Sequence, residues 1–359
     1  MQKFFSALAV SAVLTAPGLA EDPPSARTPN DIVAAAPAGA WKRIAPSDLL
    51  VMDLAPDAAG KLRRVVIQLI PAPFSQGWVG NIRRLVAARW YDGIAVVRVQ
   101  DNYVVQWGDP EGENPAKAKP LPKGLSVVSE ADYVSEIEST MMLADKEGDL
   151  GRMRANMAFA GGEKRFAKLI SAGNDPYAGT MIVDGWPMAM GPLESASSMG
   201  RTSGNPGLFP ERKTIAADRA AYAWPVHCYG YVGVGRNNSP DTGTGAELYA
   251  VIGHAPRQLD RNVAIVGRVI SGIENLSALP RGSGDIGFYR TPQERVAIRS
   301  VRMGNEVTGL PEYEYLSTDS RSFSAYVDKR ANRKDDFYIH PAGGVDVCNV
   351  PVPIREASR

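Results

Sequence analysis

The chain has 359 residues, of which 44% are hydrophobic and 22% charged, a composition typical of one large globular domain or two modest ones. A formal net charge of +1 gives no long-range field that would attract nucleic acid or an anionic membrane surface. Three histidines and two widely separated cysteines lack the spacing of a metal centre. Polyanion binding and metal chemistry are therefore poor candidates for the function.

The first 45 residues predict a targeting segment followed by a linker. Lys3 precedes an apolar run over residues 4–14, and small residues follow up to Ala20. This is the pattern of a secretory signal peptide over residues 1–20, and the run is too short to span a bilayer comfortably. Residues 21–45 are rich in proline, alanine and polar residues, which predicts a flexible leader. We expect cleavage after Ala20 and a periplasmic or secreted mature protein.

Along the next segments the spacing of apolar residues changes from that of strands to that of a helix, and then back to that of strands. Residues 47–53 and 64–70 have the apolar and β-branched density of strands and predict a hairpin. Apolar residues then recur at helical spacing over residues 81–90, and Ser75 is placed to cap this helix. After a turn, residues 94–109 alternate with a period of two, which predicts two short strands.

Residues 94–109 also bring a cation, an aromatic ring and an amide into positions from which they can face one groove. This segment resembles the active-site signature of the cyclophilin peptidyl-prolyl isomerases. In that family an Arg, an aromatic residue and a Gln form half of the proline-binding groove, and a Gly and an Asp follow. The matching residues here are Arg98, Tyr103, Gln106, Gly108 and Asp109.

The chain resembles the same family again further on, and in the same order. The strand pattern resumes over residues 229–235, 247–252, 262–270 and 293–303, with a short helical piece at 271–279. The family's Gln-Phe-Phe-Ile strand, its Leu-Asp pair and its Phe-Gly-Lys-Val run are matched by residues 247–250, 259–260 and 266–273.

The resemblance implies a mainly β fold, a closed eight-stranded antiparallel barrel capped by helices, built from residues 46–110 and 226–308. Closure leaves no exposed strand edge. Residues 111–225 separate these segments and have helical composition at 130–144, 151–172 and 213–222, so we predict a helical insertion that acts as a lid or a partner surface. Residues 309–359 match nothing in the family and predict a C-terminal extension with an extended, proline-containing end.

The activity implied by the resemblance is rotation of an X-Pro bond, without metal or nucleotide cofactor. The barrier is about 18–20 kcal/mol because rotation breaks amide resonance. A fixed donor close to the proline nitrogen stabilises the twisted amide. The resemblance assigns this catalytic role to Arg98, oriented by Gln106. It also implies a substrate-binding set of Tyr103, Val104, Gly235, Arg236, Glu247, Tyr249, Leu259 and Val263. Without the resemblance, the arginine would read as a surface residue and the aromatic residues as core.

Four positions depart from the family pattern. Val97 and Val263 stand where the family has His, and Gln258 stands where it has Trp. The two Val residues remove polar contacts from the rim of the groove, so we expect them to narrow the substrate range more than to abolish rotation. Glu247 stands where the family has an amide. A carboxylate close to Arg98 could pair with it, divert the donor from the substrate and lower turnover.

The glycine pair near residue 233 and the two cysteines each allow more than one interpretation. The pair Gly233 and Gly235 suggests a dinucleotide loop, but the third glycine of that motif falls at Asn238. Cys228 and Cys348 form either a disulfide that closes a long loop in an oxidising compartment or two buried free thiols.

We therefore predict a peptidyl-prolyl cis-trans isomerase that acts on proline-containing unfolded or extended polypeptides, with neither nucleic acid nor membrane insertion involved. A protein partner could bind at the insertion. The competing hypothesis is a weakly active or inactive barrel that keeps the groove and serves as a peptide-binding chaperone or scaffold. A third hypothesis is an envelope structural protein in which the insertion does the binding.

Overall fold

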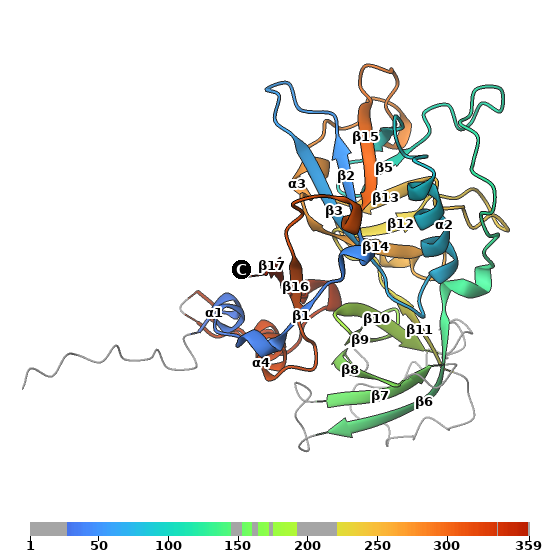
Figure 1. The fold of residues 1–359 in the computed structure, drawn as a ribbon. Coiled ribbons are helices and arrows are strands. Elements are labelled where there is room, and N and C mark those ends of the chain that lie inside the picture. Colours follow the sequence, from blue (N-terminus) through green and yellow to red (C-terminus); the bar gives the residue numbers. More distant parts are fainter. Residues whose placement is uncertain are drawn as a thin grey trace, which may run out of the picture.

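The computed structural model describes residues 27–144, 153–159, 164–171, 175–191, 221–335 and 337–357. These residues form an eight-stranded barrel, a six-stranded barrel and a small sheet flanked by two helices (Figure 1). Within the described ranges, no helix is both long and apolar enough to cross a membrane.

The eight-stranded barrel closes in the order β12-β13-β5-β4-β15-β2-β3-β14, and every neighbouring pair is antiparallel. The predicted mainly β fold with a closed eight-stranded antiparallel barrel is confirmed. The predicted first hairpin is β2 paired with β3. The strands are β2 (Leu49–Leu54), β3 (Arg63–Leu69), β4 (Ala95–Val99), β5 (Val104–Gly108), β12 (Tyr231–Val234), β13 (Leu248–Val251), β14 (Ile265–Ser271) and β15 (Val296–Met303).

Helix α2 (Gln76–Ala87) packs its apolar face against this barrel and buries Trp78, Val79, Ile82, Leu85 and Val86. Ser75 precedes the helix in a left-handed conformation with φ of 54°, and its side chain makes no capping hydrogen bond. The predicted Ser75 cap is therefore wrong. The indole N–H of Trp78 donates to the carbonyl of Thr242 at 3.0 Å and ties the helix to the loop after β12. A much shorter helix, α3 (Glu274–Ser277), follows β14.

The insertion is a second closed barrel, ordered β10-β11-β6-β7-β8-β9. The prediction of a helical insertion is wrong in the described residues. Glu, Met, Leu and Ala are good helix formers, but intrinsic propensity is a weak determinant, and the antiparallel pairing of β6 with β7 and of β7 with β8 overrides it. The helix predicted at 213–222 lies outside the described residues except for its last two positions, which belong to β11. The strands are β6 (Ser135–Ala144), β7 (Met153–Phe159), β8 (Lys164–Ser171), β9 (Gly179–Val183), β10 (Trp186–Gly191) and β11 (Ala221–Pro225).

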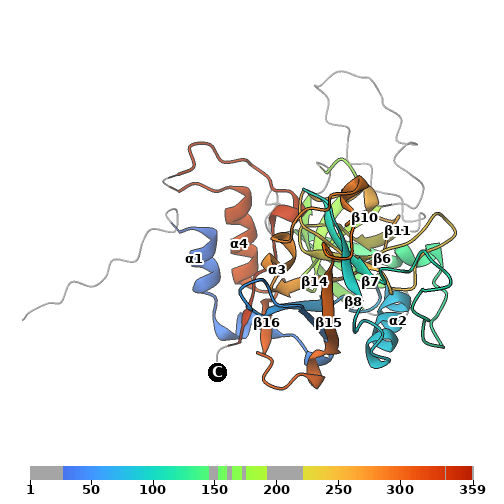
Figure 2. The ribbon, with the colours of Figure 1, turned by 90° about the horizontal axis from the view of Figure 1, so that it is seen from above.

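The third part joins both ends of the described chain. Strands β1 (Trp41–Arg43), β16 (Tyr313–Leu316) and β17 (Ile354–Glu356) form one sheet in the order β1-β16-β17. Helices α1 (Pro29–Ala34) and α4 (Arg321–Ala331) lie side by side next to it (Figures 1 and 2).

The prediction of a flexible leader is therefore wrong for residues 27–45. Two interactions explain why these residues have a defined structure, one local and one between the two ends of the chain. Thr28 and Asp31 form a reciprocal capping box at the start of α1. Trp41 is buried beneath the Arg355 guanidinium, whose carbon lies 3.8 Å from the ring centroid. The leader thus packs against the C-terminal extension, which the sequence pattern could not reveal. Short 3₁₀ helices occur at Ala38–Ala40, Pro46–Asp48, Glu130–Tyr133, Arg257–Leu259, Asp285–Gly287, Gly304–Glu306 and Val347–Asn349.

One hydrophobic cluster runs through all three parts, and a disulfide and a buried arginine are among the further connections between them. A disulfide joins Cys228, just before β12, to Cys348 in the C-terminal extension, so the two cysteines are not free thiols. The buried arginine is Arg268 of β14. Its Nε and Nη2 donate to Gln68 Oε1 at 3.0 and 2.8 Å, and its Nη1 donates to the Gly185 carbonyl at 2.6 Å, in the turn between β9 and β10. This guanidinium also stacks on Trp186 of the second barrel, 4.4 Å from the ring centroid.

Replacement of this guanidinium should loosen the junction of the barrels. We expect Arg268→Met to lower the free energy of unfolding by about 2–3 kcal/mol, because two buried acceptors lose their donor. Urea unfolding followed by circular dichroism measures the loss. The control is Arg299→Met, an exposed position on β15, which should change stability by less than about 0.5 kcal/mol. Equal effects of the two substitutions would contradict this role for Arg268.

Candidate functional site

The candidate site begins at the hairpin of β4 and β5. The register of this pair shifts between Val96 and Arg98, and the shift brings Arg98 opposite Gln106. The Nη1 of Arg98 donates to Gln106 Oε1 at 2.9 Å, and its Nε donates to the Ile286 carbonyl at 2.8 Å. Its Nη2 donates to Gln100 Oε1. The arginine is half-buried, and this burial lowers the pKa of Arg98 below its ordinary value. The guanidinium is therefore held in one place at the rim of the barrel.

A pocket of about 480 Å³ opens beside this guanidinium. The predicted residues that line it are Arg98, Tyr103, Val104, Gln106, Gly235, Arg236, Tyr249, Leu259 and Val263. The structure thus brings together nine of the ten predicted site residues. Its floor is apolar, since Val104, Tyr249 and Val251 form one buried cluster with Tyr103 and Val263 packed against it. A proline-sized apolar ring could occupy this floor.

The tenth predicted residue, Glu247, lines an adjoining cleft that also contains Arg98 and Gln106. The sequence raised the possibility that Glu247 could pair directly with Arg98. Instead, in the described part of the chain, the carboxylate accepts a hydrogen bond from Gln106 Nε2 and forms no ion pair with Arg98. The amide of Gln106 separates the two charges, because only its Nε2 can donate to a carboxylate and only its Oε1 can accept from a guanidinium.

Although the Glu247 residue keeps substantial exposure, its carboxyl group is packed close to other groups. A Cβ at Gly235 would lie 2.8 Å from Oε1 of Glu247. Burial raises the pKa of the Glu247 carboxyl above its ordinary value, while the hydrogen bond from Gln106 and the charge of Arg98 oppose the rise. The proton therefore leaves Glu247 at a higher pH than it leaves an exposed glutamate.

Tyr249 presents its ring to the pocket and directs its hydroxyl away from it. The hydroxyl lies 2.7 Å from Nε2 of the buried His227. Burial raises the pKa of Tyr249 well above its ordinary value. A Cβ at Gly233 would overlap this hydroxyl, so the glycine leaves room for the tyrosine.

Several residues at the site were not found by sequence reasoning. Ile286 supplies a carbonyl to Arg98, and the ring of Phe288 lies 5.4 Å from the guanidinium carbon. Both lie nearly 200 positions further along the chain, and no local pattern signals the contact. Val234, Asn237 and Asn238 also line the pocket. In the described ranges, no group of three or more His, Cys, Asp or Glu side chains could hold a metal ion.

Comparison with known proteins identifies the family of the chain. A family model described as cyclophilin type peptidyl-prolyl cis-trans isomerase/CLD matches residues 63–303. The chain belongs to this family. A comparison with curated proteins gave no match.

Solved cyclophilin structures share the fold. The cyclophilin AquaCyp293 from Hirschia baltica is 18% identical, with a TM-score of 0.56 over 93% of this chain and 99% of that chain. A cyclophilin-type peptidyl-prolyl cis-trans isomerase from Cryptosporidium parvum is 11% identical over 71% of this chain and 96% of that chain, with a TM-score of 0.35. The first likeness supports the fold alone, and the second is too low to carry an argument. The function of the pocket in this cyclophilin therefore rests on the residues that line it.

The raised pKa of Glu247 can be measured directly. In a pH titration of the glutamate side-chain carboxyl carbons by NMR, Glu247 should titrate above the ordinary glutamate range. Glu294 is the internal control, because a hydrogen bond from Ser283 lowers the pKa of that carboxyl. Since the folded pKa of Glu247 is raised, its contribution to stability is full below the ordinary glutamate pKa and is lost as the pH rises through the raised value. A Glu247 midpoint at or below that of Glu294 would contradict the assignment.

Proposed function

We propose that this cyclophilin is an active peptidyl-prolyl cis-trans isomerase and that Arg98 stabilises the twisted amide. Family membership supports the isomerase role, and the observation that carries the mechanism is the fixed guanidinium beside an apolar pocket. When an X-Pro bond rotates, conjugation is lost and the proline nitrogen regains a lone pair. A donor already positioned there favours the twisted state over both planar states, and each 1.4 kcal/mol gained accelerates rotation about tenfold.

Arg98 keeps donors for a substrate. Among the described residues, three of its five N–H groups have protein acceptors, which leaves one N–H on each terminal nitrogen. Both remaining N–H groups lie in the plane of the guanidinium and are available to acceptors such as the proline nitrogen and the adjacent carbonyl oxygen. The hydrogen bond to Gln106 and the chain from there to Glu247 keep the guanidinium oriented before a peptide binds, so no reorganisation is needed during rotation.

The substrate that we propose is an extended segment of an unfolded polypeptide. The apolar floor, with Tyr249 as its buried aromatic member, fits a proline ring. We place the peptide on either side of the proline along Gly235 and Arg236, which line the pocket.

We also propose that the protein works outside the cytoplasm, as a periplasmic or secreted folding catalyst. The apolar run before Ala20 lies outside the described residues, so this part rests on its sequence. The Cys228–Cys348 disulfide supports it, because disulfides persist mainly in oxidising compartments.

One observation favours a second candidate, a peptide-binding chaperone or scaffold with little isomerase activity. Arg98 is held by Gln100 and the Ile286 carbonyl as well as by Gln106, and these acceptors compete with the substrate for the guanidinium. If the competition prevails, the groove binds proline peptides without accelerating rotation.

Substitution of Arg98 separates these two functions. We expect Arg98→Ala to lower kcat/KM for a short X-Pro peptide by about 100-fold, because the donor of the twisted state is lost. Arg98→Lys, which keeps the charge and loses the planar fork, should fall between the wild type and Arg98→Ala. Arg299→Ala, an exposed arginine on β15, is the matched control and should keep the full rate. Equal rates for Arg98→Ala and the wild type would rule out the catalytic role, and no acceleration by either would favour the binding function.

The activity should also depend on the protonation of Glu247. Ionised Glu247 can only accept, so it holds Gln106 with Oε1 towards Arg98. Protonated Glu247 can donate to that same oxygen and compete with Arg98. We therefore expect kcat/KM to fall by about fivefold as the pH drops through the raised pKa of Glu247, which corresponds to about 1 kcal/mol. Glu247→Gln should remove this acidic limb from the pH profile, and persistence of the limb in the variant would contradict the relay.

A further inference from the structure

A buried chain of hydrogen bonds begins at the floor of the proline pocket. The hydroxyl of Tyr249 lies 2.7 Å from His227 Nε2, and His227 Nδ1 lies 2.8 Å from Asp260 Oδ1. The backbone N–H of His227 donates to the same oxygen at 2.9 Å. A carboxylate only accepts, so Nδ1 carries a hydrogen, and in the neutral imidazole Nε2 accepts from the tyrosine hydroxyl. All three side chains are at least nine-tenths buried.

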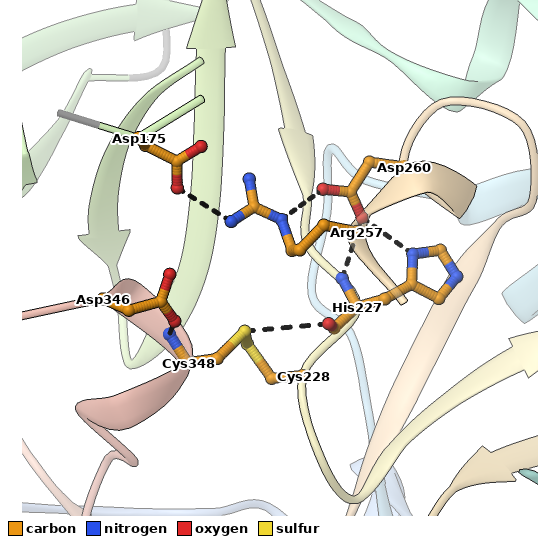
Figure 3. Close-up of a disulfide and its surroundings, with 7 residues drawn as sticks. All are labelled: Asp175, His227, Cys228, Arg257, Asp260, Asp346 and Cys348. Carbon is orange, nitrogen blue, oxygen red and sulfur yellow. Dashed lines mark hydrogen bonds and ion pairs between the residues drawn. A yellow bond between two sulfur atoms is a disulfide. The ribbon is translucent and has the colours of Figure 1, made fainter. Parts of the chain in front are cut away.

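The second barrel reaches this chain through a buried ion pair. Arg257 Nε donates to Asp260 Oδ2 at 2.6 Å, and Arg257 Nη1 donates to Asp175 Oδ2 at 2.9 Å. Asp175 lies just before β9 of the second barrel. Figure 3 shows these groups in a row, with Asp175 and His227 at opposite ends and Arg257 and Asp260 between them.

The C-terminal extension reaches the same histidine from another side. Cys228 directly follows His227 in the chain and is bonded to Cys348 of the extension. The Sγ of Cys348 lies 3.6 Å from the carbonyl oxygen of His227 (Figure 3). Both parts of the molecule outside the first barrel therefore converge on His227, one through its side-chain partner Asp260 and one through its backbone.

This arrangement leaves Tyr249 a single position. The hydroxyl passes over Gly233, where any Cβ would overlap it, and ends at His227. If His227 moved, the hydroxyl would lose its acceptor in a buried setting, which is costly. The ring would then have to turn or shift in the pocket that it lines together with Val104 and Val263.

We propose that His227 and Asp260 are positioning residues for Tyr249, and that Asp175 and the Cys228–Cys348 disulfide hold them in place. Through them the second barrel and the extension set the affinity of the groove for proline peptides. This inference rests on the proposed function and deepens it. The ring of Tyr249 contacts the proline in the planar and the twisted states alike, so a displaced ring weakens binding uniformly. KM rises and kcat stays nearly constant.

The test combines peptide kinetics with a signal from Tyr249 itself. The variants are Tyr249→Phe, the double variant Cys228→Ser with Cys348→Ser, and Asp175→Asn. Each should raise KM for an X-Pro peptide about three- to tenfold and leave kcat within about twofold. Tyr326→Phe removes a comparably buried tyrosine hydroxyl, bonded to the Pro351 carbonyl in the extension, and should leave KM unchanged. In a Tyr249→Phe background, the cysteine substitutions should raise KM no further.

The ¹H–¹³C ring resonances of Tyr249 provide the second measurement, which needs no substrate. They should shift in the cysteine double variant and in Asp175→Asn, and Asp175→Asn alone decides if the double variant fails to fold. Unchanged ring resonances, or a KM increase that adds in full to that of Tyr249→Phe, would overturn the proposal. If the wild type fails to accelerate rotation, the proposed function fails, and the ring resonances still decide whether Tyr249 is positioned in this way.

Discussion

The antiparallel pairing of β4 with β5 is the constraint on which the site depends. The register shift between Val96 and Arg98 brings the guanidinium opposite Gln106, at the mouth of the pocket. This register is in turn fixed by the neighbours of the hairpin, because β5 also pairs with β13 and β4 with β15 in a closed barrel. A slip of one residue would turn Arg98 to the opposite face of the sheet. Barrel closure therefore contributes to the chemistry as well as to stability, since it leaves the hairpin no alternative pairing.

The two charged side chains of the site, Arg98 and Glu247, do not pair with each other directly. A guanidinium and a carboxylate lie within one groove, and a direct bidentate pair between them would be their strongest interaction. The neutral amide of Gln106 lies between Arg98 and Glu247 and bonds to both. Burial lowers the pKa of Arg98 and raises that of Glu247, so the cation and the anion are both disfavoured by the same partial desolvation. The amide accepts one N–H of Arg98, whereas a bidentate pair with Glu247 would occupy two.

The barrel and the residues of the groove could be predicted because their signals are local. Arg98, Tyr103 and Gln106 occupy one hairpin, whose strands the period of two across residues 94–109 predicts, and the resemblance to the cyclophilins assigned these three residues to the groove. The second barrel could not be predicted, because several of its strands are rich in residues that favour helices and become strands through pairing with distant segments and burial in the shared core. The acceptor that Ile286 offers to Arg98 and the bond between His227 and Tyr249 arise from the tertiary fold. Neither sequence position carries a pattern that indicates its partner.

Buried polar groups join the first barrel to the second, and they restrict how the two barrels are oriented. Apolar contacts between two barrels would tolerate a range of relative orientations, because they are not directional. A buried guanidinium has no such freedom, since a small rotation leaves its donors or their acceptors unpaired. Arg268 meets the turn of the second barrel at Gly185, and Arg257 meets that barrel at Asp175. These two contacts restrict rotation of one barrel on the other. Because Arg257 also holds Asp260, the orientation of the second barrel is linked to the histidine behind the pocket. We infer that this fixed orientation, more than added stability, explains why charged groups are buried at the junction.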